Sequence, residues 1–323
     1  MVKTNSLKAW VLAARPKTLT GAIAPVLVGT AFAYSQLSTF NFQLSTPNFH
    51  LSTLLCFLFA ILMQIDANLI NDYFDFRKGT DREDRLGPER ACAQGWITPR
   101  AMQWGIGVMT ALSCLVGLSI LLIHMQWELL IVGVLCVLFC FLYTTHLSYL
   151  GWGDLLVLVF FGFVPVIFTH YVITAGEWSI PLVIASLAMG LATDNLLMVN
   201  NYRDRHQDKV SGKRTMIVRI IEASSKHYGD EEGRKKGEKF CLHLYLWLGI
   251  IATLLAVISL CLTATFPMIV IKLGLLLIYL LLHFKTFRQM KAIDGKALNA
   301  VLGATARNIF LFGFLLAVSI LLW

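Results

Sequence analysis

The chain contains nine apolar runs, each about as long as a helix that crosses a bilayer. They cover residues 19–37, 51–70, 102–124, 127–147, 155–175, 180–199, 241–262, 266–284 and 300–322. About 20 apolar residues span the hydrocarbon core as a helix, which satisfies its own backbone hydrogen bonds there. Only 14% of the 323 residues are charged, whereas soluble domains have roughly 25%. We therefore expect an all-α integral membrane protein, with a single domain over residues 1–323.

The basic residues predict how these helices are oriented. Of the 27 Lys and Arg residues, only Lys272 and Arg307 fall inside apolar runs, and the rest precede the first run or lie in alternate connections after it. Because cytoplasmic loops are enriched in Lys and Arg, the N-terminus and every basic connection are predicted to be cytoplasmic. The net charge of +8 then reflects topology and contact with the anionic lipid bilayer, so we expect no nucleic-acid partner.

The segment 10–17 precedes the first run and predicts a short interfacial helix on the cytoplasmic face. Its ordinary role is to anchor the chain at the membrane surface. A functional alternative is that Arg15 or Lys17 reaches an anionic substrate. The anchor is the preferred interpretation from sequence.

Carboxylates and side-chain amides gather at the cytoplasmic ends of the second and sixth runs. The first cluster contains Asn68, Asn71, Asp72, Asp75 and Asp81, and the second contains Asn200, Asn201, Asp204 and Asp208. Residues four apart share one face of a helix. The first cluster therefore contains two amide–carboxylate pairs, and spacing alone leaves open which one is the counterpart of Asn200 and Asp204. Carboxylates at the end of a membrane span are costly and by default mark a functional site.

An all-oxygen set of this kind suits a hard divalent cation such as Mg²⁺, and no Cys or His pair at metal spacing points to zinc. Mg²⁺ uses one or two carboxylates and completes its coordination with water and phosphate oxygens. Cationic neighbours are expected to hold the rest of a diphosphate, namely Arg77, Lys78, Lys213 and Arg214. A diphosphate at the cytoplasmic mouth and an apolar cavity behind it match a lipid diphosphate.

Metal and basic groups in this position would stabilise the negative charge on a departing diphosphate, so that an allylic carbon–oxygen bond ionises and an electron-rich ring captures the carbocation. Four aromatic residues near the mouth are candidates to shield that cation: Tyr73, Phe74, Tyr143 and Tyr202. Each of them is individually more typical of packing. The alternative class of protein is an ion-coupled transporter. Transporter sites lie near the bilayer midplane, whereas both acidic clusters here lie at the cytoplasmic ends of their runs, so this class is disfavoured.

Several short motifs occur in a fixed order along the chain. They are Ala14 to Leu19, Asn68 to Asp81 continued by Glu83 to Pro88, Gly153-Asp154, Asn200 to Asp204, and Gly212 to Thr215. This ordered set resembles the UbiA superfamily of intramembrane aromatic prenyltransferases. Within it, the chain is similar to the MenA family of 1,4-dihydroxy-2-naphthoate polyprenyltransferases.

The resemblance implies nine helices around a central cavity and Mg²⁺-dependent binding of a polyprenyl diphosphate. It implies transfer of the prenyl group to an aromatic acid acceptor, 1,4-dihydroxy-2-naphthoate, with loss of diphosphate and CO₂, which gives demethylmenaquinol for menaquinone biosynthesis. The expected location is a bacterial inner (cytoplasmic) membrane, with the active site facing the cytoplasm.

The superfamily's first motif, Asn-Asp-x-x-Asp-x-x-x-Asp, matches Asn71, Asp72 and Asp75, and its last carboxylate falls on Gly79, so Asp81 is expected to replace it. This match makes Asn71 and Asp75 the counterparts of Asn200 and Asp204. The implied metal ligands are Asp72, Asp75, Asp81, Asp204 and Asp208, of which all but Asp81 are also expected to be catalytic. The implied diphosphate-binding residues are Asn68, Asn71, Arg77, Lys78, Asn200, Asn201, Lys213 and Arg214.

Two segments depart from the family pattern. The loop after Tyr143 and Thr144 is about two residues shorter than in the naphthoate branch, which keeps other hydroxynaphthoates, 4-hydroxybenzoate and homogentisate open as acceptors. The segment 222–239 is longer than usual and rich in charge and glycine, and it is predicted to be a mobile or helical cytoplasmic extension.

Overall fold

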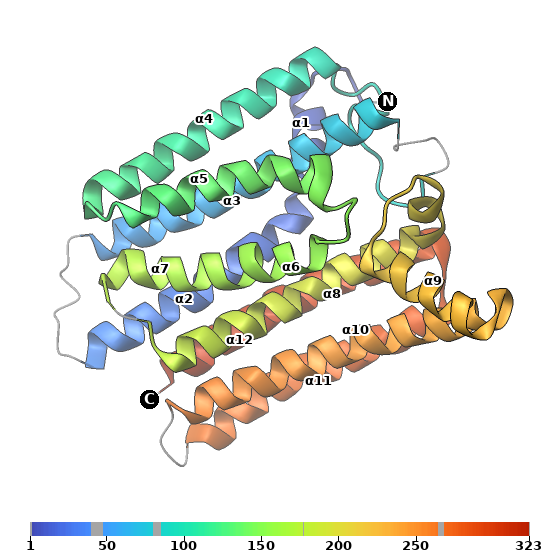
Figure 1. Cartoon of the computed structure of the whole chain (residues 1–323). Helices are drawn as coiled ribbons and strands as arrows, with labels where there is room; N and C mark the ends of the chain where they lie inside the picture. Colours follow the sequence, from blue (N-terminus) through green and yellow to red (C-terminus); the bar gives the residue numbers. More distant parts are fainter. Residues whose placement is uncertain (1, 40–47, 80–84, 177, 264–267, 323) are drawn as a thin grey trace.

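The computed structural model describes residues 2–39, 48–79, 85–176, 178–263 and 268–322, and helices make up most of this part of the chain (Figure 1). The α-helices are α1 (Leu7–Ala14), α2 (Leu19–Thr39), α3 (Phe49–Lys78), α4 (Pro99–His124), α5 (Glu128–Leu142), α6 (Gly153–Leu158), α7 (Val164–Thr174), α8 (Ile180–Val210), α9 (Met216–Tyr228), α10 (Asp230–Cys261), α11 (Met268–Ala292) and α12 (Leu298–Leu321). Short 3₁₀ turns cover Pro16–Thr18 and Gly295–Ala297, and π-helical turns cover Tyr143–Leu147 and Val159–Phe163.

The described residues contain nine helical stretches that are long and apolar enough to cross a membrane, which confirms the predicted number of spans. The π-helical turn Val159–Phe163 joins α6 and α7 into one of them. Two helices run well past the apolar part of their sequence, since α3 continues to Lys78 and α8 to Val210. Both acidic clusters therefore lie on the final turns of long helices, apart from Asp81, which lies outside the described residues.

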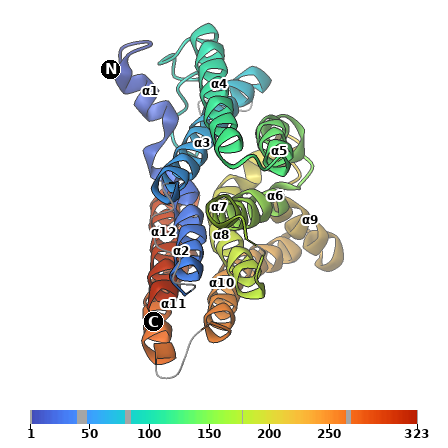
Figure 2. The ribbon, with the colours of Figure 1, turned by 90° about the vertical axis from the view of Figure 1, so that its left-hand side faces the viewer.

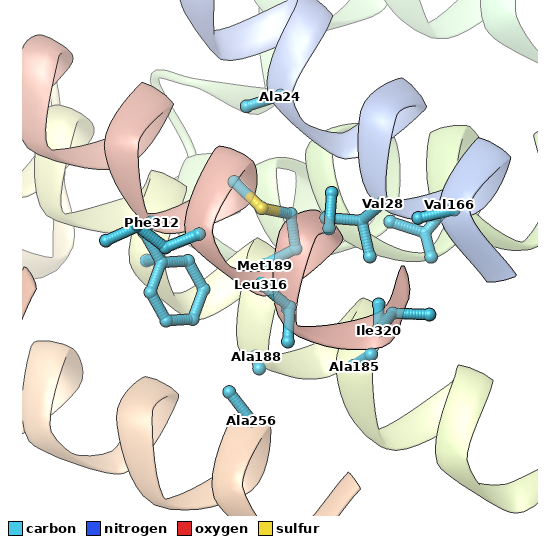
Figure 3. Close-up of a cluster of buried hydrophobic side chains, with 14 of the residues drawn as sticks. Ala24, Val28, Val166, Ala185, Ala188, Met189, Ala256, Phe312, Leu316 and Ile320 are labelled. Atoms are coloured by element: carbon cyan, nitrogen blue, oxygen red, sulfur yellow. The ribbon is translucent and has the colours of Figure 1, made fainter. Parts of the chain in front are cut away.

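Small residues allow the central helices to pack closely. In the largest apolar cluster α2 packs on α7 and α12, and α8 packs on α10 and α12 (Figures 2 and 3). Its labelled members are Ala24, Val28, Val166, Ala185, Ala188, Met189, Ala256, Phe312, Leu316 and Ile320. The four alanines among them allow the helix backbones to approach closely. Membrane helices gain van der Waals contact in this way, because there is no strong hydrophobic driving force between helices in lipid.

The C-terminal ends of α3 and α8 lie at the same end of the bundle as α1 and α9, and the chain termini lie at opposite ends (Figure 1). The segment 222–239 is helical here, because α9 and α10 form a hairpin around Gly229, which has the left-handed φ of 85°. At the N-terminus α1 ends where Arg15 takes a φ of 52°, and α2 follows after one 3₁₀ turn.

Candidate active site

A cavity of about 420 Å³ opens among α2, α3, α5, α6, α7 and α8. Its polar lining gathers toward the end where α3 and α8 finish and includes Arg15, Asn68, Asn71, Arg85, Arg90 and Asn200. Apolar and aromatic side chains line the rest, among them Phe59, Met63, Phe139, Phe160 and Phe168. This arrangement provides a charged mouth that continues into an apolar chamber.

One of the two amide–carboxylate pairs on α3 holds neighbouring backbone in place. The carboxylate of Asp72 is buried and accepts hydrogen bonds from the backbone N–H groups of Ala91 (2.8 Å) and Cys92 (3.0 Å). One turn earlier, Asn68 Nδ2 donates to Ala14 O at 2.9 Å and to Thr18 Oγ1 at 3.0 Å. These contacts attach the turn after α1 and the segment around residue 91 to α3.

The other pair consists of Asn71 and Asp75. Asn71, like Asn68, is part of the cavity lining, and Asp75 forms an ion pair with the lining residue Arg90, with 3.5 Å between Asp75 Oδ2 and Arg90 Nη2. Asp75 also interacts electrostatically with Lys213, beyond the end of α8. Asp75 is therefore the α3 carboxylate that interacts with residues of the second cluster, whereas Asp72 holds the backbone of Ala91 and Cys92.

The second cluster meets the first around Lys213. Asn200 lines the cavity, and the Asp208 carboxylate lies 3.9 Å from Lys213 Nζ and interacts electrostatically with both Asp204 and Asp75. Asp208 Oδ2 is buried and has no hydrogen-bond partner among the described residues. Asn201 is buried in α8 but does not belong to the cavity lining.

The donor set fits Mg²⁺ better than a metal that needs a closed protein cage. No three His, Cys, Asp or Glu side chains converge on a metal position in the described part of the chain. Mg²⁺ needs only one or two carboxylates when water and phosphate oxygens supply its remaining ligands, and the unpartnered Oδ2 of Asp208 is one such oxygen. At Gly79 α3 ends with a left-handed φ of 67°, which explains the glycine where the family motif has a carboxylate.

None of the four predicted diphosphate-binding cations belongs to the cavity lining. Arg77 is exposed, and its Nη1 donates to Tyr73 Oη at 3.3 Å. Lys78 Nζ donates to Thr145 O at 2.7 Å and lies 3.8 Å from the centre of the Tyr149 ring. Carbonyl groups at the end of a helical segment attract a cation in this way. The side chain of Arg214 is exposed, which leaves Lys213 as the predicted cation nearest both acidic clusters.

Arginines that the sequence did not single out as site residues take this place. Arg85 and Arg90 line the cavity mouth, and Arg15, which the sequence favoured as an anchor, lines it too. Burial lowers the pKa of the Arg85 guanidinium from its usual value, and the nearby carboxylates of Asp204 and Asp75 oppose that shift. The sequence signal for Arg85 and Arg90 was their position in the mixed-charge connection directly after the first cluster.

Of the four aromatic residues predicted near the mouth, Tyr143 lines the cavity. Tyr73 faces α4, where its hydroxyl accepts a hydrogen bond from Gln103 Nε2 at 2.6 Å, and the Tyr202 ring lies 4.3 Å from Arg205 Cζ. The segment after Tyr143 is a π-helical turn in which Thr144 is buried and His146 is exposed. The tyrosine, and not the histidine, is therefore the part of this turn that borders the cavity.

Behind Tyr143 lie two further carboxyl groups. Asp154 on α6 and Asp194 on α8 interact electrostatically with each other and with Tyr143. Each has a buried Oδ1 without a hydrogen-bond partner among the described residues. Nothing in the sequence pointed to Asp194, because a single carboxylate within an apolar run has no motif around it.

Comparison with known proteins identifies the fold and the family. A family model described as "UbiA prenyltransferase family" matches residues 22–299. The 1,4-dihydroxy-2-naphthoate octaprenyltransferase of Escherichia coli K12 is 36% identical over 230 residues, which are 68% of this chain and 71% of that protein. The protein of the same name from Mycobacterium tuberculosis H37Rv is 35% identical, over 68% of this chain and 73% of its own length.

Two solved structures share the architecture at low identity. A digeranylgeranylglyceryl phosphate synthase superposes with a TM-score of 0.57 at 20% identity and covers 98% of each chain. A UbiA homologue from Archaeoglobus fulgidus, bound to DMAPP and Mg²⁺, gives a TM-score of 0.56 at 13% identity over 96% of this chain and 99% of that one. Sequence and architecture agree, and the chain belongs to the UbiA prenyltransferase family.

Proposed function

We propose that this protein transfers a polyprenyl group from polyprenyl diphosphate to 1,4-dihydroxy-2-naphthoate, with release of diphosphate and CO₂, in menaquinone biosynthesis. The observation that carries the proposal is that carboxylates from both clusters lie beside cations next to an apolar cavity: Asp208 is 3.9 Å from Lys213, and Asp75 pairs with the cavity-lining Arg90. Relatives that are 36% identical bear the name of this naphthoate prenyltransferase, which supports the choice of acceptor.

Asp75, Asp204 and Asp208, together with the amides of Asn71 and Asn200, are the residues that would hold Mg²⁺. When bound, the cation would neutralise charge on the diphosphate oxygens. The archaeal homologue is bound to DMAPP and Mg²⁺, which supports Mg²⁺ as the cation but does not name its ligands. Asp72 is better suited to positioning than to direct ligation, because its carboxylate is only 1% exposed and holds the backbone N–H groups of Ala91 and Cys92, whereas the side chain of Asp204 is 13% exposed. Asp81 stays a prediction, since it lies outside the described residues.

Cations at the mouth complete the head-group site. Arg15, Arg85 and Arg90 line it, and Lys213 lies between the two acidic clusters. Guanidinium groups bind phosphate oxygens through two parallel N–H bonds, and they stabilise negative charge most strongly where water is excluded. The prenyl chain would occupy the apolar chamber beside Phe139, Phe160 and Phe168.

The reaction breaks the allylic carbon–oxygen bond, and its electron pair leaves with the diphosphate. The ring carbon that bears the carboxylate attacks the allylic carbon and forms the new carbon–carbon bond. The carboxylate then leaves as CO₂, and the electrons of the bond that it gives up restore the aromatic ring. Aromatic faces along the cavity stabilise the allylic cation and exclude water during this sequence.

Other aromatic acids would follow the same course, so a panel of hydroxynaphthoates, 4-hydroxybenzoate and homogentisate distinguishes the acceptor. Ion-coupled transport is disfavoured by position as well as by family, because both acidic clusters lie on the last turns of α3 and α8 and not near the bilayer midplane.

The head-group assignment is tested with Asp75→Asn and Asp204→Asn in purified protein supplied with Mg²⁺, a polyprenyl diphosphate and the naphthoate. Each variant is expected to lose at least ~100-fold in turnover, as when an electrostatic contact to a transition state is removed. Glu231→Gln is the control, since Glu231 is exposed and pairs with Lys235 on the same face of α10. Turnover near that of the control in either variant would rule out the assignment.

A further inference from the structure

Arg203 occupies an unusual position between Asn200 and Asp204. It is among the largest fully buried side chains of the protein, with 1% of its surface exposed. Its Nε donates to Asp204 Oδ1 at 2.7 Å, and its Nη2 donates to Asp204 Oδ2 at 2.6 Å and to Asn200 Oδ1 at 2.8 Å. One guanidinium group thus holds both members of the amide–carboxylate pair that faces the first cluster.

The same guanidinium connects this pair to α12 and to the segment 85–88. Arg203 Nη1 donates to Asn299 Oδ1 at 2.9 Å, and Asn299 Nδ2 donates to Leu86 O at 2.8 Å. Gly87 packs directly against the guanidinium, because a Cβ atom at this position would lie 2.7 Å from Arg203 Nη2 and 3.1 Å from its Cζ. The segment that carries Arg85 to the cavity mouth is therefore seated on Arg203.

The arrangement satisfies a cation that would otherwise be costly to bury. A buried charge is tolerated when it is paired and its hydrogen-bond donors are used, and the four hydrogen bonds above meet that requirement. Asp204 keeps acceptor capacity, since an ionised carboxylate has about four lone-pair sites and Arg203 uses two of them. The carboxylate is thus oriented and still able to bind a cation.

We propose that Arg203 is a positioning residue that presets Asn200 and Asp204 for the metal–diphosphate head group and couples their orientation to the segment 85–88. The inference rests on the proposed function. It deepens that function by assigning the geometry of the second acidic cluster to a residue that does not itself touch the substrate. Preset ligands bind more tightly because less ordering remains to be done on binding.

The test is a titration of purified protein with Mn²⁺, followed by electron paramagnetic resonance in the presence of inorganic diphosphate. Arg203→Lys keeps the positive charge but loses the planar fork that binds Asp204 and Asn200 together. The dissociation constant for Mn²⁺ is expected to rise about tenfold or more, the scale of a lost charged hydrogen bond. Excess Mn²⁺ should restore the diphosphate binding of this variant.

Two further variants act on the guanidinium from outside α8. Gly87→Ala places a methyl carbon 2.7 Å from Arg203 Nη2, closer than van der Waals contact allows, so it should displace the guanidinium and weaken Mn²⁺ binding without any change of charge. Asn299→Asp keeps the acceptor for Arg203 Nη1 but loses the donor to Leu86 O, so it separates the attachment of segment 85–88 from the orientation of Asp204. It should weaken the binding of diphosphate more than that of Mn²⁺ alone. Gly303→Ala is the matched control on α12, because its new methyl group meets no atom within 4 Å.

Melting temperatures of all variants are measured in parallel. The inference would be overturned if Arg203→Lys and Gly87→Ala both fold and their dissociation constants for Mn²⁺ are within twofold of the wild-type value. If Arg203→Lys does not fold, the result for Gly87→Ala decides alone. A wild-type protein that binds Mn²⁺ and diphosphate but makes no prenylated product would sink the proposed function, and the binding differences would still test the role of Arg203.

Discussion

Asp72 and Asp75 lie three residues apart on α3 and have different surroundings. Asp72 accepts two backbone hydrogen bonds from residues 91 and 92, whereas Asp75 faces Arg90 and the second acidic cluster. A buried carboxylate that accepts two backbone N–H groups stabilises the fold, whereas Asp75 is held by an ion pair with Arg90, a residue of the cavity lining. We propose that these two members of one sequence motif have different roles, Asp72 in the fold and Asp75 in binding.

The division predicts opposite effects of the same substitution. Asp72→Asn leaves only one acceptor oxygen for the N–H groups of Ala91 and Cys92, so the free energy of unfolding should fall by about 1–3 kcal/mol. Asp75→Asn should leave the melting temperature close to that of wild type and weaken binding of Mg²⁺ with diphosphate. Thermal unfolding in detergent, with and without these ligands, measures both; a stable Asp72→Asn beside an unstable Asp75→Asn would contradict the assignment.

At this scale the sequence predicted the acidic clusters but not the partners of each side chain. Four-residue spacing identified the pairs on α3, and the structure was needed to show that Asp72 holds the backbone of Ala91 and Cys92 while Asp75 pairs with Arg90. Arg85 and Arg90 reach the mouth because the connection after α3 folds back over α8 and α12. Such long-range contacts leave no periodic signal in a single sequence.

At the scale of the helices, hydropathy predicted the nine membrane-spanning segments but not the polar helical turns that continue beyond them. The apolar runs marked all nine spans of the described chain, since the thickness of the membrane sets their length. The final turns of α3 and α8 are polar, so they carry no hydropathy signal, although they bear the acidic clusters. Helical extension beyond the apolar run is what brings Asp75 of α3 and Asp208 of α8 near one another.

Close packing of α8 against the π-helical turn between α6 and α7 depends on two glycines. A Cβ atom at Gly162 would lie 2.6 Å from Ser186 O and 2.8 Å from Gly190 Cα. Gly162→Ala should therefore force these helices apart and lower the melting temperature, with a cost of about 1–3 kcal/mol for overpacking. Gly133→Ala on α5 is the control, because its methyl group meets open space. Equal melting temperatures for the two variants would show that the contact is not needed.

At the scale of the whole molecule, the described helices form a bundle whose termini lie at opposite ends, as an odd number of spans requires (Figure 1). Basic residues gather in the connections on one side of it, where the acidic clusters also lie. We propose from this bias that the active site faces the cytoplasm of a bacterial inner membrane. Soluble polar substrates would then enter from the cytoplasm and the prenyl chain from the bilayer.

The orientation predicts the behaviour of C-terminal fusions in a bacterial inner membrane. With the N-terminus in the cytoplasm and nine spans, the C-terminus lies outside, so a fused alkaline phosphatase should be active and a fused green fluorescent protein dark. A truncation after α11 that carries the same reporters reverses the expected pattern and serves as the control. Bright fluorescence of the full-length fusion would show that the topology is inverted.

The central claim is prenyl transfer to the carboxylated ring carbon of 1,4-dihydroxy-2-naphthoate. Its most direct test supplies purified protein in lipid with Mg²⁺, a polyprenyl diphosphate and naphthoate labelled in the carboxyl group, and measures prenylated product together with labelled CO₂. We predict that the two form in equal amounts and that both depend on the diphosphate. Prenylated product that retains the label, or no product from folded protein, would contradict the claim.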